Sequence, residues 1–194
     1  IHPEFCRFLD SMDVRNYVNV KKISGGLRNE STIIGGVVFT KNVAHKDMKT
    51  KIDNPKVLLL QCPIAYQRVE GKFVTIESLI LQEKEYLRNV TSRILSLAPD
   101  VVLVHKNVSG IAQDLLRTHG ITLVLDVKLS VFERLQRCLQ CDIVTSIDSN
   151  IGRPKLGICK RFYTKTFTDA NAASKTLMFF DIPYSQRGCS LLLR

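Results

Sequence analysis

The sequence lacks tryptophan, and only 7% of its 194 residues are aromatic. It has no apolar run near the roughly 18 residues that a membrane-spanning helix requires. Residues 1–10 lack the basic-then-apolar order of a secretory signal peptide. The first residue is not Met, and the strand-like run Leu191–Leu193 stops at Arg194 without a turn. We therefore expect a cytoplasmic domain that was cut from a larger protein.

The motifs of the common catalytic sites are also missing. The sequence has no G-x-x-x-x-G-K-[ST] phosphate loop, no G-x-G-x-x-G, no G-x-S-x-G, no H-E-x-x-H and no kinase H-R-D or D-F-G set. The glycine pairs at residues 25–26 and 35–36 are not followed by a helix start, so they are poor phosphate cradles. We predict no catalytic residue and no cofactor site in this chain.

Six cysteines are too few and too scattered for a secreted disulfide scaffold. Cys138 and Cys141 form a C-x-x-C, but no second pair at a comparable spacing completes a zinc site. The pair falls at the C-terminal end of an expected helix, where the helix dipole disfavours a thiolate. We predict two structural thiols, one facing the core and one in the turn, and no metal site.

The formal net charge is +10, with lysines densest in residues 41–56 and 155–165. Such a charge attracts anionic partners, which include nucleic acid, anionic lipid and acidic protein surfaces. No aromatic residues alternate with these lysines, as a surface that stacks bases would require. We therefore expect a solvated basic surface without nucleic acid, and keep an anionic lipid or nucleic-acid module as a further alternative.

The middle of the chain alternates short apolar runs with amphipathic segments. The runs predict buried strands, and the amphipathic segments, with apolar residues at helical spacing, predict helices packed on a sheet. Ser130 and Glu133 have the spacing of a capping box, which places the start of the third helix at Ser130. The expected order is strand 57–60, helix 77–97, strand 101–104, helix 108–119, strand 121–125, helix 130–140 and strand 143–144. This β-α-β-α-β-α-β series favours parallel pairing with right-handed crossovers.

The last third of the chain instead predicts antiparallel strands at 157–167, 176–180 and 190–193, which 35–40 could join. The expected fold class is α/β, with a β-sandwich part fused to the β-α-β-α-β-α-β part. Residues 1–31 are interpreted as a linker or hinge arm, and residues 32–194 as the folded domain.

Several segments resemble the apical domain of group II chaperonins in order and spacing. They are STIIGGVVFTKNVAHKDM, PKVLLLQCPI, APDVVLVHKNVSGIAQDLLRTHGITLVLDVK and ERLQRCLQCDIV. More narrowly, MDVRNYVNVKKISGG and TLMFFDIPYSQRGCSLLLR resemble the chaperonin-like region of PIKfyve-type phosphatidylinositol-3-phosphate 5-kinases. The resemblance covers nearly everything after residue 31 and implies a chaperonin apical-domain-like fold.

The resemblance also implies a function, which is a non-catalytic protein-interaction or regulatory domain of a lipid kinase. Such a kinase makes phosphatidylinositol 3,5-bisphosphate on the cytosolic face of endosomal membranes, which other parts of the parent protein would reach. Its partners would be a HEAT-repeat scaffold and a phosphoinositide phosphatase, and only its distant kinase domain would need ATP and Mg²⁺. The alternative is the apical client-binding domain of a group II chaperonin subunit, which takes part in ATP-dependent folding.

In chaperonin apical domains, two successive helices hold the client protein. By motif, these correspond to residues 77–97 and 108–119 here. The candidate protein-binding residues, which should point outward, are Gln82, Glu85, Asn89, Ser92, Gly110, Gln113, Asp114 and Arg117. For most single positions a solvated helix surface is the simpler interpretation, because an interface usually depends on a minority of its residues.

Overall fold

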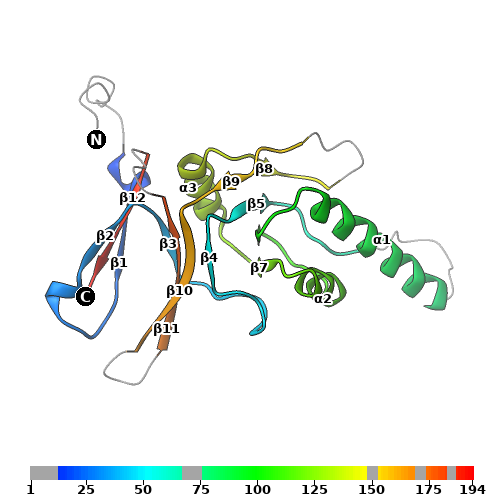
Figure 1. Ribbon diagram of the computed structural model, residues 1–194, viewed down its shortest axis with the longest axis horizontal. Helices are drawn as coiled ribbons and strands as arrows, with labels where there is room; N and C mark the ends of the chain where they lie inside the picture. The colour runs from blue at the N-terminus through cyan, green and yellow to red at the C-terminus, as the bar shows by residue number, and fades with distance from the viewer. Residues whose placement is uncertain (1–12, 67–75, 148–152, 169–173, 183–186) are drawn as a thin grey trace.

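The computed structural model describes residues 13–66, 76–147, 153–168, 174–182 and 187–194. These residues form three sheets and three α-helices (Figure 1). No helix among them combines the length and the apolarity needed to cross a membrane.

The first sheet is built on parallel strands in the order β7-β6-β5-β8, and the short β9 pairs antiparallel with β5. This confirms the predicted alternation of strands and helices. Its strands are β5 (Lys56–Leu60), β6 (Val101–Val104), β7 (Thr122–Val124), β8 (Ile143–Val144) and β9 (Gly157–Ile158). The strand interiors are continuously apolar because both faces of the sheet are covered.

Alternate side chains of β5 enter two different hydrophobic clusters. Leu58 and Leu60 pack in the cluster that includes residues of α1 (Ile76–Ser96) and α2 (Gly110–Thr118). Val57 and Leu59 pack in the cluster that includes residues of α3 (Leu129–Leu139). The two-residue period of a strand therefore puts α1 and α2 on one side of the sheet and α3 on the other (Figure 1).

The second sheet is antiparallel, in the order β3-β11-β10-β4. The third has the order β1-β12-β2 and packs on the second through apolar residues that include Val38, Phe179 and Leu192. Together they form the predicted sandwich part. The strands are β1 (Val18–Lys22), β2 (Thr32–Ile34), β3 (Gly36–Phe39), β4 (Lys51–Asp53), β10 (Arg161–Thr168), β11 (Ser174–Asp181) and β12 (Cys189–Leu193).

Strand β12 has one pairing that the sequence did not predict. It runs antiparallel to β2 but parallel to β1, with Val18 opposite Cys189 and Lys22 opposite Leu193. Strands β1 and β2 lie on either side of the predicted boundary at residue 31, yet both pair with β12. The third sheet is therefore continuous across that boundary, while the hinge role of residues 1–31 stays a prediction.

The three helices begin within two residues of their predicted starts, but the predicted cap of α3 is wrong. The N-cap residue is Lys128, and Ser130 lies in the first turn of the helix. The backbone N–H groups of Val131 and Phe132 both donate to the Lys128 carbonyl, so the helix has already begun before Ser130. Ser130 and Glu133 have the capping-box spacing, but Ser130 lies two residues after the N-cap position, so its side chain does not cap the helix.

Candidate protein-binding site

Helix α1 carries one apolar stripe, of which only the second half is buried. Leu87, Val90 and Ile94 are at most 3% exposed and pack over the parallel sheet. Ile80 and Ile76 continue the stripe toward the N-terminus of the helix, at steps of seven and four residues. They are 47% and 75% exposed, because the first half of α1 projects past the edge of the sheet (Figure 1). We call this projecting apolar surface, Ile76 and Ile80 with Leu79, the α1 overhang.

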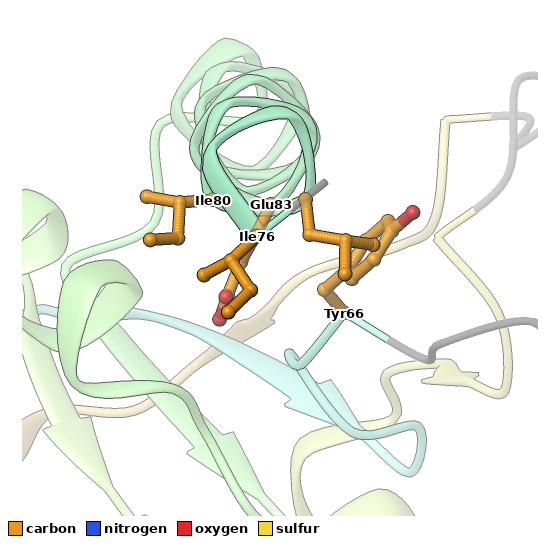
Figure 2. A pocket seen from close by; sticks show the side chains of 5 residues that line it. Tyr66, Ile76, Ile80 and Glu83 are labelled. Atoms are coloured by element: carbon orange, nitrogen blue, oxygen red, sulfur yellow. The ribbon is translucent and has the colours of Figure 1, made fainter. Parts of the chain in front are cut away.

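A pocket of about 190 Å³ lies at the overhang. Figure 2 shows Ile76, Ile80 and Glu83 of α1 and Tyr66, from the segment after β5, along its walls. The Tyr66 hydroxyl donates to Gln82 Oε1 at 3.2 Å, and the Tyr66 ring meets the Tyr86 ring edge-on at 5.6 Å between centroids. Aromatic and aliphatic walls with a single carboxylate suit an apolar side chain of a partner protein.

The predicted polar residues of α1 lie on the opposite side of the helix from Leu87. Gln82, Glu85, Asn89 and Ser92 are all exposed. These residues are three or four positions apart, so they form one polar stripe along α1, as the helical periodicity predicted. We call these four residues the outer stripe. The structure brings these four side chains onto one surface.

The predicted residues of α2 are less uniform. Gly110 and Asp114 are exposed, whereas Gln113 and Arg117 are partly buried. Gln113 Nε2 donates to the Val108 carbonyl at 2.9 Å. Arg117 lies 3.0 Å from an Asp47 carboxylate oxygen and 3.3 Å from one of Asp114. Both side chains therefore hold the domain together in addition to facing outward.

One apolar residue of α2 lies outside the core. Ile111 is 36% exposed, although it is one of the apolar residues whose helical spacing predicted a helix packed on the sheet. Ala112 and Leu116, four residues apart, define the buried line of this nine-residue helix. Ile111 precedes Ala112 by one residue, which is about 100° of rotation, and so turns away from the sheet.

The thiols of the C-x-x-C lie in the core. Cys138 is 8% and Cys141 is 3% exposed, so both thiols of the pair are buried, including the one that was predicted to lie in the turn. Burial raises the pKa of the Cys141 thiol to about 11 and that of the Cys159 thiol to about 12. Both thiols stay protonated at neutral pH, which removes their nucleophilicity. Within the described ranges, no three His, Cys, Asp or Glu side chains are grouped to hold a metal ion.

Sequence reasoning missed the α1 overhang. The spacing of Ile76, Ile80 and Leu87 carries its signal, since the stripe can be extended backwards from Leu87 by steps of seven and four. The spacing does not show where the sheet ends. The edge of the sheet decides which residues of the stripe are buried and which are exposed.

A sheet of parallel strands with two helices on one face, joined to a sandwich of one antiparallel and one mixed sheet, defines a chaperonin apical-like domain. The fold is similar to the open-state monomer of a group II chaperonin from Methanococcoides burtonii, with a TM-score of 0.71 at 22% sequence identity. The match covers 93% of this chain and 39% of that one. The model of the TCP-1/cpn60 chaperonin family matches residues 6–194, and the chain belongs to this family.

The chain is also similar along its length to much larger proteins. It is 63% identical over 192 residues to a protein of Drosophila melanogaster named putative 1-phosphatidylinositol 3-phosphate 5-kinase. It is 47% identical over 195 residues to the human and 39% over 190 residues to the Saccharomyces cerevisiae 1-phosphatidylinositol 3-phosphate 5-kinase. These matches cover 99%, 100% and 97% of this chain but only 10%, 9% and 8% of the relatives. The chain therefore spans about a tenth of the relatives' length.

Proposed function

We propose that this chain is a protein-interaction and regulatory domain, without catalysis of its own, in a phosphatidylinositol-3-phosphate 5-kinase. The parent would make phosphatidylinositol 3,5-bisphosphate on the cytosolic face of endosomal membranes, with ATP and Mg²⁺ held by its kinase domain. The similarity along the whole chain to proteins of that name supports this placement. The observation that carries the binding role is the α1 overhang.

The overhang favours a helical partner. Ile76 and Ile80 lie on one side of a helix that projects from the domain, with Glu77 and Lys84 exposed on the same half. A helix with one apolar side fits between two helices of a partner, as in helix-in-groove recognition. A HEAT-repeat scaffold is built from stacked helix pairs that offer such grooves. The outer stripe of α1 and the exposed Gly110 and Asp114 of α2 would then form the polar rim of the interface.

Binding of the purified HEAT-repeat scaffold to the 194-residue chain tests this proposal. The variant Ile76→Ser with Ile80→Ser changes the overhang, and Glu85→Lys with Asn89→Lys changes the outer stripe. We expect the overhang variant to weaken binding about tenfold or more, because buried apolar anchors dominate interfaces. We expect a smaller loss for the stripe variant, because exposed rim charges contribute little.

The matched control is Glu133→Lys with Gln136→Lys on α3, which makes the same kind of change at two exposed positions on the far side of the sheet. It should bind as the unchanged chain does. Full affinity in both α1 variants, with circular dichroism showing folded protein, would remove α1 from the interface and refute the proposal.

A second function is favoured by the exposed apolar residues of α1, since Ile76 of the overhang is 75% exposed and Leu81, outside the overhang, is 67% exposed. Such side chains can hold an unfolded client, as the chaperonin alternative requires. The two functions differ in specificity. If the chain suppresses aggregation of a chemically denatured test enzyme, and Ile76→Ser with Ile80→Ser abolishes this while scaffold binding is absent, the client-holding role is the correct one.

A further inference from the structure

A carboxylate interrupts the apolar stripe of α1 at the position where burial begins. The stripe runs along the helix at steps of four and three residues, through Ile76, Ile80, Glu83, Leu87, Val90 and Ile94. Each step brings the next side chain back to the same side of the helix. Glu83 is therefore the one charged member of a stripe that is otherwise aliphatic. It lies between the exposed Ile80 and the buried Leu87, and it is itself partly buried.

Glu83 has no cation of its own helix within reach. On a helix, ion pairs form between residues that are three or four positions apart. The residues at those positions from Glu83 are Leu79, Ile80, Tyr86 and Leu87. Lys84 lies one position away and Arg88 five positions away, so neither shares the side of the helix on which Glu83 lies. No ion pair in the parts of the chain that the structure describes includes Glu83.

The same carboxylate belongs to the pocket of about 190 Å³ at the α1 overhang. The three aliphatic residues of the overhang form part of the wall, and the ring of Tyr66 and the carboxylate of Glu83 complete it (Figure 2). Tyr66 is held in place, because its hydroxyl donates to Gln82 Oε1 and its ring contacts the ring of Tyr86. The pocket therefore offers aliphatic contact, an aromatic ring and a negative charge within one space.

The apolar walls alone would accept a wholly apolar side chain, and the carboxylate narrows this choice. A side chain that enters the pocket removes water from Glu83, and a carboxylate without water needs a cation or hydrogen-bond donors. Leaving that charge desolvated and unpaired costs more free energy than the burial of one apolar side chain gains. The occupant must therefore have an apolar stem that ends in a cation, as lysine and arginine do.

Arginine fits this pocket better than lysine. Its planar guanidinium can form two parallel hydrogen bonds with a carboxylate and can stack on an aromatic ring. Glu83 supplies the carboxylate, and Tyr66 supplies the ring. The ammonium group of lysine is compact and strongly hydrated, so it loses more when it leaves water. The methylene stem of arginine would lie along Ile76 and Ile80.

We infer that the pocket at the α1 overhang binds an arginine side chain from a helix of the partner protein, and that Glu83 selects this side chain. A charged residue within an apolar helix stripe fixes the register of the correct partner and disfavours partners that lack the matching charge. The assignment of the arginine to a HEAT-repeat scaffold rests on the proposed function. The charge of the anchor rests on the pocket alone.

Titration of the 194-residue chain with N-acetyl-arginine methylamide, followed by nuclear magnetic resonance, tests the pocket without any scaffold. We expect saturable shifts of the amide signals of Tyr66 and Ile80, and we expect Glu83→Gln to abolish them. The uncharged N-acetyl-norleucine methylamide should leave these signals nearly unchanged. Glu133→Gln is the matched control, because it removes the same charge from an exposed position on α3, and it should bind the arginine probe normally. Absence of saturable shifts, or equal shifts from the two probes, would overturn the inference.

Binding of the purified HEAT-repeat scaffold tests whether the scaffold supplies the arginine. Glu83→Gln should weaken this binding about tenfold, because it removes a charge-assisted contact. Glu83→Arg should weaken it further, because it brings two cations together, whereas Glu133→Gln should bind as the unchanged chain does. Circular dichroism shows that each variant folds.

The two proposals can fail separately. If the arginine probe binds through Glu83 but the scaffold does not bind at all, the proposed function fails and the arginine pocket stands. If scaffold binding depends on Ile76 and Ile80 but is equal in Glu83→Gln and Glu133→Gln, the proposed function stands and the role of Glu83 is overturned.

Discussion

The hydroxyl of Ser190, on β12 of the third sheet, forms hydrogen bonds with two backbone groups of β3 in the second sheet. It accepts from the Val38 N–H at 3.1 Å and donates to the Gly36 carbonyl at 3.0 Å. Ser190 is on β12 and only 1% exposed, so neither backbone group of β3 has water as a substitute partner. The Ser190 side chain thus adds two buried hydrogen bonds to the apolar packing between the third sheet and the second.

Replacing Ser190 by Ala should lower the free energy of unfolding by about 2 kcal/mol or more, since it leaves a buried donor and a buried acceptor unpaired. Urea denaturation measures the change. Ser92→Ala, at an exposed position of α1, is the control and should change stability by less than about 0.5 kcal/mol. Equal stability of the two variants would show that the Ser190 bonds contribute nothing.

Gly36 and Gly110 should respond in opposite ways to alanine. Gly36 has φ near 139°, and a Cβ there would lie 2.0 Å from the Phe180 carbonyl oxygen of the neighbouring strand. Gly36→Ala should therefore prevent normal pairing of β3 with β11 and lower thermal stability strongly. At Gly110 an added Cβ meets no atom within 4 Å.

Gly110→Ala should keep or raise stability by up to about 1 kcal/mol, because alanine is the better helix residue. Thermal unfolding of the two variants side by side checks the prediction. A Gly36→Ala protein as stable as the unchanged chain would contradict the close approach of β3 and β11.

The buried thiols predict how stability depends on alkaline pH. The folded-state pKa values of Cys141 and Cys159, about 11 and about 12, lie above the ordinary value of 9.0. Below pH 9 both folded and unfolded chains keep these protons, and the contribution is fully present. Between pH 9 and about 11 the unfolded chain binds fewer protons, so stability falls by up to about 1.4 kcal/mol per pH unit for each thiol.

Urea denaturation at a series of pH values from 8 to 10.5 measures this slope. The variant Cys141→Ala with Cys159→Ala should be less stable at pH 8 but should lose less stability as the pH rises. A double variant with the same slope as the unchanged chain would assign the alkaline loss to other groups.

Lys21 is partly buried near the positive charges of Arg134, Lys175 and Lys128, which predicts a salt-dependent effect on stability. Lys21→Gln removes one of the mutually repelling charges, so it should raise stability at low ionic strength by roughly 0.5 kcal/mol, after allowance for solvent screening. The gain should shrink as salt is added. Lys22→Gln serves as the control, and thermal unfolding at two salt concentrations provides the comparison. Destabilisation by Lys21→Gln at low salt would contradict the repulsion.

The local elements of this fold could be predicted because their signals are local. The run from Val57 to Leu60 is apolar at every position, as a strand covered on both faces requires. Gly120 follows α2 with φ near 74°, the left-handed conformation that a glycine after a helix commonly provides. The parallel pairing of β1 with β12 was out of reach, because nothing in either strand specifies a partner from the far end of the chain.

The candidate site likewise has one part that the sequence could predict and another part that it could not. The exposure of Glu85 and Asn89 follows from helical periodicity alone. The internal bonds of Gln113 and Arg117 depend on Val108 and Asp47, whose positions only the folded chain brings within reach.

The parallel alignment of β1 and β12 has a mechanical consequence. Five residue pairs, from Val18 with Cys189 to Lys22 with Leu193, hold the two strands side by side in the same direction. A pull that drew the N-terminal end of β1 away from the C-terminal end of β12 would load these ladder bonds together, in shear, and could not unzip them one after another. The domain would therefore resist tension along this axis and transmit it as a stiff link.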